Sequence, residues 1–323
     1  MKKILTFGRY SRKKFGTTVY KVPISISGFT CPNIDGTTAV GGCTFCENDS
    51  FSPNLGQAQP LDHNKKFYLN LNSTSNPHLD LQLKQLDQQF KNVSAQMKKT
   101  YGAKKFIVYF QSFTNTYAPI ETLKALYERA LSFDSVVGLS IGTRSDSITE
   151  ETLAYLAELN KSKEIWIEFG IQSVFDKTLE RINRGHDSAN VKTWIAKSKE
   201  AGLKVCAHLI YGLPGEDEAM MMQTFDESIA LDVDALKIHP LYVVTKTALA
   251  NDFTKGKFTP ITQDLYIDLL VQSLKKLPKN IMMQRISAGI SDPSLLAPAW
   301  CGESKNSQMK HIKRALLKEG IDY

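Results

Sequence analysis

Strand-like and helix-like segments alternate along most of this chain, and that alternation constrains its fold more than any other feature. Runs rich in β-branched and aromatic residues, typical of strands, lie at residues 22–26, 106–110, 136–141, 165–170, 205–210, 235–238 and 281–286. Amphipathic stretches with helical periodicity lie between them, at residues 79–97, 120–131, 150–159, 175–182, 191–201, 218–231 and 262–277. Serial βα units imply a parallel sheet, so the sequence predicts an α/β fold. Periodicity alone leaves an open doubly wound sheet and a closed or partly closed barrel as alternatives.

The segments that follow the predicted strands are rich in polar and glycine residues. In a βα barrel the carboxyl ends of the strands form one continuous rim, and active sites are built there. Turns of this kind are often polar without forming a site, but a cysteine in the first of them favours a site. The strand-end residues that we select are Cys31, Gln111, Asn115, Thr143, Arg144, Asp146, Gln172, Gly212, Leu213 and His239.

The mild excess of positive charge is compatible with a polyanionic partner but does not require one. Forty lysines and arginines against 33 acidic residues give a net charge of +7, and RNA-binding proteins are often basic. Basic residues near the N-terminus are interleaved with Tyr10 and Tyr20, a pattern that suits RNA contact. An ordinary solvated segment is the alternative for this run, which consists of Arg9, Arg12, Lys13, Lys14 and Lys21.

Neither a membrane span nor a secretion signal is predicted. Nowhere do 18 or more apolar residues follow one another, and the apolar run at the start of the chain is too short for a signal peptide. We therefore expect a cytoplasmic protein that does not contact membranes. Five cysteines, an odd number, argue against a disulfide framework in that setting.

Three of the five cysteines lie within 16 residues, in the spacing C-x11-C-x2-C formed by Cys31, Cys43 and Cys46. Thiolates select soft metals such as zinc, copper(I) or iron in iron–sulfur clusters. A structural zinc site needs a fourth protein ligand, whereas a three-cysteine [4Fe–4S] cluster leaves one iron open to a small ligand. The spacing alone does not decide between a zinc ion and an iron–sulfur cluster. Cys206 fits a buried apolar position, and Cys301 fits either a free thiol or a radical-relay residue.

The string around these cysteines resembles a known family. Cys43-Thr44-Phe45-Cys46 is similar to half of the radical S-adenosylmethionine (SAM) signature, although the first gap is eleven residues instead of three. The motifs 29–37, 109–119, 138–144, 181–187, 205–216 and 237–239 extend the resemblance over nearly the whole chain. Together they resemble the YhcC/MnmL-like group of the radical SAM superfamily, which is related to the radical-SAM part of the Elongator catalytic subunit.

This resemblance implies a partial (β/α)6 TIM-like barrel of the radical SAM type with a C-terminal cap. The core would span residues 1–250, with a basic N-terminal segment 1–21, a cluster loop 29–47 and an insertion 47–78, and the cap would span 251–323. The implied cofactors are a [4Fe–4S] cluster held by Cys31, Cys43 and Cys46, and SAM. Reductive cleavage of SAM would give a 5′-deoxyadenosyl radical that abstracts hydrogen from the substrate.

The resemblance also implies where SAM lies. Phe45 would pack near the adenine, Gln111 and Asn115 would meet the amino group, and Thr143, Arg144 and Asp146 would suit the ribose and carboxylate. Glu168 and Gln172 lie four residues apart on one strand, and a buried Glu168 would need the SAM amino group or Arg184 as its partner. Gly212 and Leu213 would lie beneath the adenine. His208, Lys237 and His239 are candidate catalytic residues near the rim, and Arg285 is a candidate for a carboxylate or phosphate.

Three functions follow in order of preference. The first is a radical SAM enzyme that modifies the wobble uridine (position 34) of tRNA toward aminomethyl-type uridines, with an electron donor such as flavodoxin or ferredoxin and a downstream methyltransferase as partners. The second is a radical SAM enzyme with a small-molecule substrate. The third is a zinc-stabilised RNA-binding protein without catalysis, which would be colourless where the first two would be brown.

Overall fold

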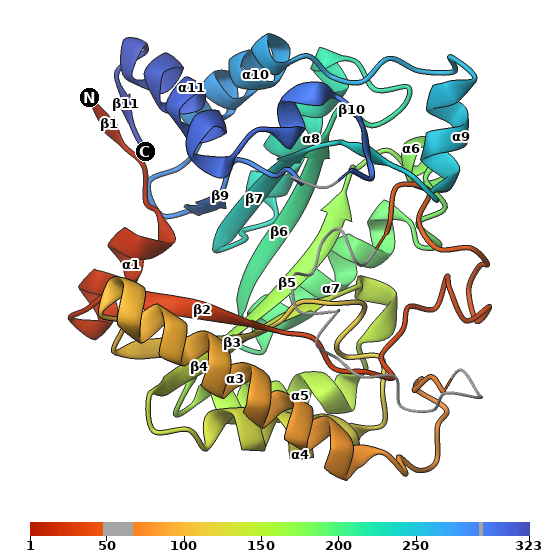
Figure 1. Ribbon diagram of the computed structural model, residues 1–323, viewed down its shortest axis with the longest axis vertical. Helices are drawn as coiled ribbons and strands as arrows, with labels where there is room; N and C mark the ends of the chain where they lie inside the picture. Colours follow the sequence, from red (N-terminus) through yellow and green to blue (C-terminus); the bar gives the residue numbers. More distant parts are fainter. Residues whose placement is uncertain (48–66, 291–292) are drawn as a thin grey trace.

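Seven parallel strands form the central sheet of the protein, in the order in which they occur in the chain (Figure 1). The structure is a computed structural model that describes residues 1–47, 67–290 and 293–323. The strands are β2 (Val19–Ile24), β3 (Lys105–Phe110), β4 (Val136–Thr143), β5 (Glu164–Gln172), β6 (Lys204–Tyr211), β7 (Ala235–Pro240) and β9 (Met282–Arg285). Each predicted strand is present, with its end displaced by up to three residues.

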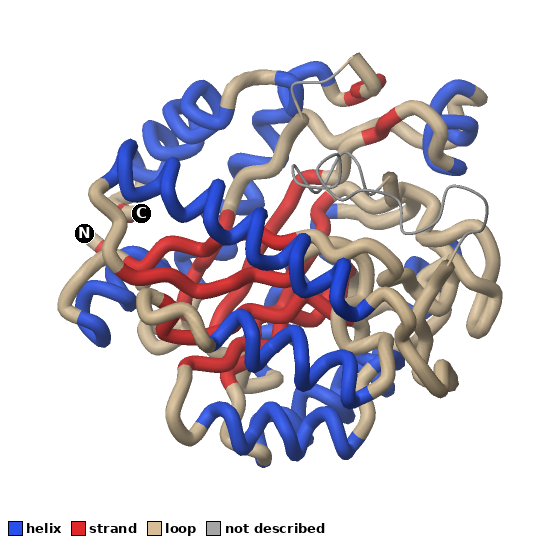
Figure 2. The backbone as a smooth tube through the Cα atoms, turned by 60° about the horizontal axis from the view of Figure 1, so that its bottom comes forward, coloured by secondary structure: helices blue, strands red, loops and turns tan. Residues whose placement is uncertain are grey.

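The sheet curls into a partial barrel that stays open on one side (Figure 1). β2 pairs only with β3 and β9 pairs only with β7, so the first and last strands do not pair with each other. Six helix-containing crossovers join the seven strands. The predicted partial (β/α)6 barrel is therefore confirmed. The tube view shows strands inside and helices outside (Figure 2).

Helices cover the outer surface of the sheet because each has one apolar face. Polar side chains cap the first turns of some of these helices, as where Thr149 accepts from the backbone of Thr152 and Asp187 from that of Asn190. The crossover helices are α3 (Leu79–Tyr101), α4 (Ile120–Leu131), α5 (Glu150–Asn160), α6 (Asp176–Arg181), α7 (Ser188–Glu200), α8 (Glu218–Ala230) and α10 (Gln263–Lys276).

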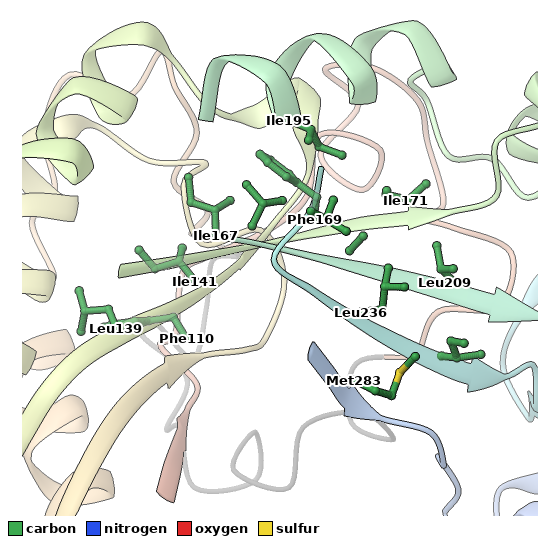
Figure 3. Packing of buried hydrophobic residues seen from close by; sticks show 14 of the residues in the cluster. Phe110, Leu139, Ile141, Ile167, Phe169, Ile171, Ile195, Leu209, Leu236 and Met283 are labelled. Atoms are coloured by element: carbon green, nitrogen blue, oxygen red, sulfur yellow. The ribbon is translucent and has the colours of Figure 1, made fainter. Parts of the chain in front are cut away.

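The apolar core lies between the sheet and these helices. Residues such as Ile141, Ile167 and Phe169 belong to the same buried apolar cluster as Ile195 of α7 (Figure 3). All four are at most 1% exposed, so each contributes about 1.5–3 kcal/mol by leaving water. This packing fixes the strands whose other face and carboxyl ends carry the polar residues discussed below.

The N-terminal segment forms a helix that the sequence analysis did not predict. α1 (Phe7–Phe15) begins at Thr6, whose side chain accepts from the backbone of Arg9. Its Phe7, Tyr10 and Phe15 pack with Val19 and Trp166. Before it, β1 (Lys2–Lys3) pairs in parallel with β11 (Ile321–Asp322) from the other end of the chain.

The C-terminal region contributes both to the barrel and to the cap over it. β9 belongs to the central sheet although it follows residue 250, so the predicted boundary there divides the sheet. Beyond it, β10 (Leu295–Ala297) pairs antiparallel with β8 (Val243–Val244), and α11 (Lys305–Lys318) follows. α9 (Ala248–Thr254) lies near β8. Most of the predicted insertion, residues 48–66, lies outside the described residues. None of the described helices combines the length and apolarity that a membrane crossing requires.

Candidate active site

A cavity of about 280 Å³ lies at the carboxyl ends of the strands. The three cysteines of the C-x11-C-x2-C motif line it, together with residues from β3, β4, β5, β6, β7 and β9. Of the predicted site residues, it brings together Cys31, Cys43, Cys46, Phe45, Gln111, Thr143, Arg144, Glu168, Gln172, Arg184, His208, Lys237, His239 and Arg285. The strand-end argument from sequence therefore located a real cavity.

Backbone turns and neighbouring side chains hold the cysteine loop. The backbone N–H of Cys46 donates to the carbonyl of Cys43 at 2.9 Å, which closes a tight turn. Asn183, which precedes α7, donates from Nδ2 to the carbonyls of Val40 and Gly42 at 2.9 and 2.7 Å. The loop is thereby attached to the segment after α6 by hydrogen bonds at several points.

Donors that surround the cysteine sulfurs suit thiolates that ligate a metal. Thr114 Oγ1 donates to Cys31 Sγ at 3.0 Å, and Asn33 Nδ2 donates to Cys43 Sγ at 3.2 Å. Arg184 Nη1 lies 3.5 Å from Cys43 Sγ. Hydrogen bonds to cluster sulfurs tune the potential of an iron–sulfur centre. Asn33 and Thr114 were not predicted as site residues, although both lie inside motifs that carried the family resemblance.

The spacing of the sulfurs fits a cluster better than a single zinc ion. Around one tetrahedral zinc, thiolate sulfurs lie about 3.8 Å apart, given a Zn–S distance of about 2.3 Å. Among the described residues, three ligand atoms come within 4.8 Å of one another only at Glu168, Cys206 and His208. The three cysteine sulfurs therefore do not all lie within 4.8 Å of one another, which disfavours a single ion held by all three in this arrangement.

Burial disfavours the ionised form of these thiols in the absence of a metal. Burial raises the pKa of Cys31 to about 11, although Thr114 and Arg144 act in the opposite direction. Burial also raises the pKa of Cys46 well above its ordinary value. Metal binding must therefore release protons, since only thiolates ligate.

Two buried arginines lie beside the cysteines. Arg144 binds both oxygens of Asp146 at 2.8 and 2.6 Å, and its Nη2 donates to the carbonyl of Arg184 at 2.6 Å. Arg184 Nη2 donates to the carbonyl of Gly170 at 2.7 Å. Arg144 Nη1 and Arg184 Nε are buried and have no partner among the described residues. Buried donors without partners indicate a missing acceptor, and the carboxylate of SAM is one that would fit.

Four of the predicted SAM-contact residues lie behind the cavity rather than on it. Asn115 donates from Nδ2 to the carbonyls of Phe110 and Gly142, so it joins the ends of β3 and β4. Asp146 orients Arg144. Gly212, at φ 93°, packs against Ile261, and Leu213 is buried with Phe45 and Cys43. These four residues do not line the cavity, and we assign them to the support of its wall.

A buried charge network occupies the inner part of the cavity, below the cysteines. Glu168 accepts from Lys21 Nζ at 2.5 Å, from Ser140 and from Lys237, and His208 Nε2 lies 2.8 Å from its Oε2. Lys237 Nζ also donates to Tyr109 Oη at 3.2 Å. Among the described residues, Glu168 is thus partnered by two lysines, a serine and a histidine. Of the two partners expected for it, the SAM amino group and Arg184, Arg184 is bound elsewhere.

The buried environment of this network shifts the pKa values of Glu168, Lys237 and His208. Burial would raise the pKa of Glu168, but Lys21 and Lys237 hold it well below its ordinary value. Burial lowers the pKa of Lys237 to about 8, against the opposing effect of Glu168. Burial, together with Lys237, lowers the pKa of His208 to about 4. At neutral pH the network therefore holds an ionised Glu168, a largely protonated Lys237 and a neutral His208.

The network also explains why Glu168, Cys206 and His208 are a poor metal site despite their proximity. Two lysine ammonium groups already neutralise Glu168, and a cation added there would meet their charge. Burial raises the pKa of Cys206 to about 12, so its thiol stays protonated. Cys206 is fully buried, in agreement with its prediction as an apolar position. Cys301 is likewise buried, among residues of the cap.

The basic run near the N-terminus does not line this cavity. Lys14 pairs with Glu164 at the first residue of β5, and Arg9 pairs with Asp322 at 2.7 Å. These contacts place α1 at the amino end of the strands, on the opposite side from the cysteine loop (Figure 1). Lys21 is in the barrel interior on Glu168. RNA contact by Arg12 and Lys13, at the far end, stays a prediction.

Comparison with known proteins identifies the family. The model of the radical SAM superfamily matches residues 37–227, and that of the radical SAM C-terminal domain matches residues 233–318. The chain belongs to the radical SAM superfamily. Its cofactors are those of the family, a [4Fe–4S] cluster and SAM, and Cys31 lies outside the matched range, in accord with its wide spacing from Cys43.

Relatives and a solved structure resemble the chain to different extents. Protein YhcC of Escherichia coli K12 is 34% identical over 316 residues, which cover 98% of this chain and 93% of that protein. The tRNA uridine(34) acetyltransferase of Methanocaldococcus jannaschii is 29% identical over 188 residues, covering 57% of this chain and 34% of that protein. The structure of Methanocaldococcus infernus Elp3 with an N-terminal deletion superposes with a TM-score of 0.64 at 19% identity, covering 94% of this chain and 65% of that one.

Proposed function

We propose that this radical SAM enzyme modifies the wobble uridine (position 34) of tRNA, in a pathway toward aminomethyl-type uridines. The observation that carries the substrate is the similarity over 188 residues to a tRNA uridine(34) acetyltransferase. That stretch covers 57% of this chain but 34% of the relative, so it supports a shared radical SAM part and leaves the acetyl-transfer activity with the relative. The net charge of +7 suits an RNA substrate.

The cysteine end of the cavity would hold the cofactors. Cys31, Cys43 and Cys46 would ligate the cluster, with Thr114 and Asn33 as hydrogen-bond donors to the sulfurs. In the site so formed, the bound cluster and SAM would together supply one-electron reductive cleavage of SAM and hydrogen abstraction from the substrate. The protein's own part is to orient these groups and to exclude water.

Residues beside the cysteines would bind SAM. Arg144 and Arg184 offer its carboxylate donors that no described residue engages, and Gln172 and Thr143 line the same cavity. Gln111 lies at the end of β3 on the cavity wall, and Phe45 packs beside the cysteines. This division leaves the inner network for the substrate.

Lys237 is the best-placed of the three candidate catalytic residues. A pKa near 8 lets its Nζ hold or release a proton close to neutral pH. Burial and nearby Arg285 lower the pKa of His239 well below its ordinary value, and His208 is also held neutral, so neither is a cation there. An electron donor such as flavodoxin or ferredoxin and a downstream methyltransferase complete the proposed pathway.

The test is mass spectrometry of tRNA nucleosides from a deletion strain. We expect a carboxymethylaminomethyl-type precursor to accumulate at the wobble uridine and the aminomethyl-type product to fall. A plasmid copy of the parent gene should restore the profile, whereas a Cys43→Ala copy should not. An unchanged wobble profile in the deletion strain would rule out the tRNA substrate and favour a small-molecule substrate in the same cavity.

A further inference from the structure

Positive charge exceeds negative charge at the inner end of the cavity. Lys237 of β7 and Arg285 of β9 line it, and Lys21 of β2 pairs with Glu168 behind the lining. Glu168 is the one acidic side chain among the lining residues that the structure describes. Lys237 is 3% exposed. Lys21 and Arg285 are half-buried. Charges withdrawn from water are costly unless they are paired, so this excess of buried and half-buried cations indicates that an anion is to be bound.

Glu168 cannot supply the missing charge, because its acceptor positions are already in use. Lys21 and Ser140 donate to Oε1, while Lys237 donates to Oε2 and His208 Nε2 lies next to it. An ionised carboxylate offers about four acceptor positions. The single negative charge of Glu168 thus balances only one of the two lysines, Lys21 and Lys237. The charge of the second lysine and that of Arg285 are not balanced by Glu168.

Two donors at this end have no partner in the part of the chain that the structure describes. Arg285 lines the cavity and makes no hydrogen bond or ion pair with any described residue, and the buried Nε2 of His239 likewise has none. The register of β7 and β9 sets Lys237 opposite Arg285. Burial and the nearby Arg285 lower the pKa of Lys305, at the start of α11. Lys305 thus adds a further cation close to Arg285.

These donors are separate from those that SAM would use. Arg144 and Arg184, which suit the carboxylate of SAM, lie with the cysteines, as the contact between Arg184 and Cys43 shows. Lys237 and Arg285 instead surround Glu168 and Tyr109, deeper in the barrel. A second anionic group, carried by the substrate, would satisfy them.

We propose that Arg285, with Lys237 and the Nε2 of His239, binds an oxyanion group of the substrate, a carboxylate or a phosphate, at the inner end of the cavity. The inference rests on the proposed function in that the cavity is the site of the radical reaction. Arg285 would hold the group by two parallel hydrogen bonds, which its planar guanidinium favours. The anion would thereby fix which carbon of the substrate faces the cysteine end.

Small anions test the site without any RNA. Acetate and inorganic phosphate are titrated into the protein carrying its cluster and SAM, and binding is followed by ligand-detected nuclear magnetic resonance, with acetamide as the uncharged control. We expect at least one anion to bind and acetamide not to bind. Arg285→Gln should weaken anion binding about tenfold or more, and Arg285→Lys should retain part of it. Lys313→Gln, an exposed change on α11, should leave it at the parent value.

The preferred anion identifies the substrate group, since acetate represents a carboxylate and phosphate a nucleotide. Equal anion binding by the parent and Arg285→Gln, with unfolding midpoints alike, would overturn the proposal. So would equal binding of acetate and acetamide by the parent. Loss of anion binding in Arg285→Gln together with an unchanged wobble profile in the deletion strain would leave the anion site standing and remove the tRNA substrate. Equal anion binding by the parent and Arg285→Gln, together with an altered wobble profile, would remove the anion site and leave the tRNA substrate standing.

Discussion

Lys21 Nζ donates a hydrogen bond of 2.7 Å to Gln284 Oε1, across the open side of the barrel. Lys21 lies on β2 and Gln284 on β9, the two edge strands of the sheet, which make no strand pairing with each other. The same ammonium group also binds Glu168 and Ser140. Side chains in the interior therefore join the two edges that the backbone leaves apart, and the charge network of the site is also a structural element of the barrel.

Glu168→Gln should destabilise the protein strongly. The change removes the counter-charge of Lys21 and Lys237 while it keeps the shape of the side chain, and leaving a buried charge unpaired costs about 3–5 kcal/mol. Urea unfolding of the parent and the variant measures the free energy of unfolding. Asp87→Asn is the control, since it breaks an exposed pair with Arg129, which contributes less than about 1 kcal/mol. Similar small losses in both variants would contradict the structural role of the network.

Only three of the five cysteines should be needed for iron. Cys31→Ala, Cys43→Ala and Cys46→Ala should each abolish the visible absorption and the reduced iron–sulfur signal of anaerobically reconstituted protein. Cys206→Ala and Cys301→Ala should keep both, because these thiols are buried away from the cluster loop. Loss of iron in Cys206→Ala with retention in Cys31→Ala would show that the ligands are assigned incorrectly.

Gly170→Ala should weaken SAM binding while the protein stays folded. A Cβ at this position would lie 2.6 Å from Gln172 Nε2 and 2.8 Å from Arg184 Nη2, so both flexible side chains would have to move. We expect the dissociation constant for SAM, measured by calorimetry, to rise about tenfold or more, or about 1.4 kcal/mol. Gly138→Ala is the contrasting variant, since its Cβ would meet the backbone oxygen of Glu164 at 2.0 Å and should reduce stability instead. Unaltered SAM affinity in Gly170→Ala would remove Gln172 and Arg184 from the SAM site.

Stability should fall between pH 6.5 and pH 4 through His208. Burial lowers its pKa from 6.5 to about 4 in the folded protein, so in this window the unfolded chain binds a proton that the folded chain does not. Unfolding is then favoured as the pH decreases, by a total of about 3 kcal/mol. His208→Gln should show a smaller decrease over the same range in urea titrations. Parallel pH profiles for the parent and His208→Gln would contradict a neutral, largely enclosed His208.

Much of the fold was predictable because its strands and helices carry clear apolar patterns. The seven strands and the crossover helices followed from periodicity, and the cysteine spacing pointed to the metal-binding loop. The position of Lys21 in the barrel interior could not be predicted from the sequence. β2 is covered on both faces, so its pattern of apolar residues does not show which side faces the interior. Lys21 was grouped with the neighbouring basic residues in the sequence, although a lysine within a barrel strand faces either helices or the interior.

α1 was missed for a related reason. Only Phe7, Tyr10 and Phe15 mark its apolar face, and the basic residues between them suggested an exposed segment. Its position at the amino end of the strands depends on contacts with β5 and β9 that are distant in sequence. The inner end of the site was likewise only partly foreseen, since Tyr109 and Gln284 acquire their roles from neighbouring strands rather than from a motif.

The pairing of β1 with β11 sets an order on folding. Lys2 lies opposite Ile321, so the two partners are separated by nearly the whole chain. At about 5–20 residues per second, the ribosome makes the second partner some tens of seconds after the first. The cysteine loop and most of the barrel strands emerge within that interval, while the N-terminal segment still lacks its neighbour. Final closure of this end of the molecule is therefore a late event, completed only when residue 322 has been released.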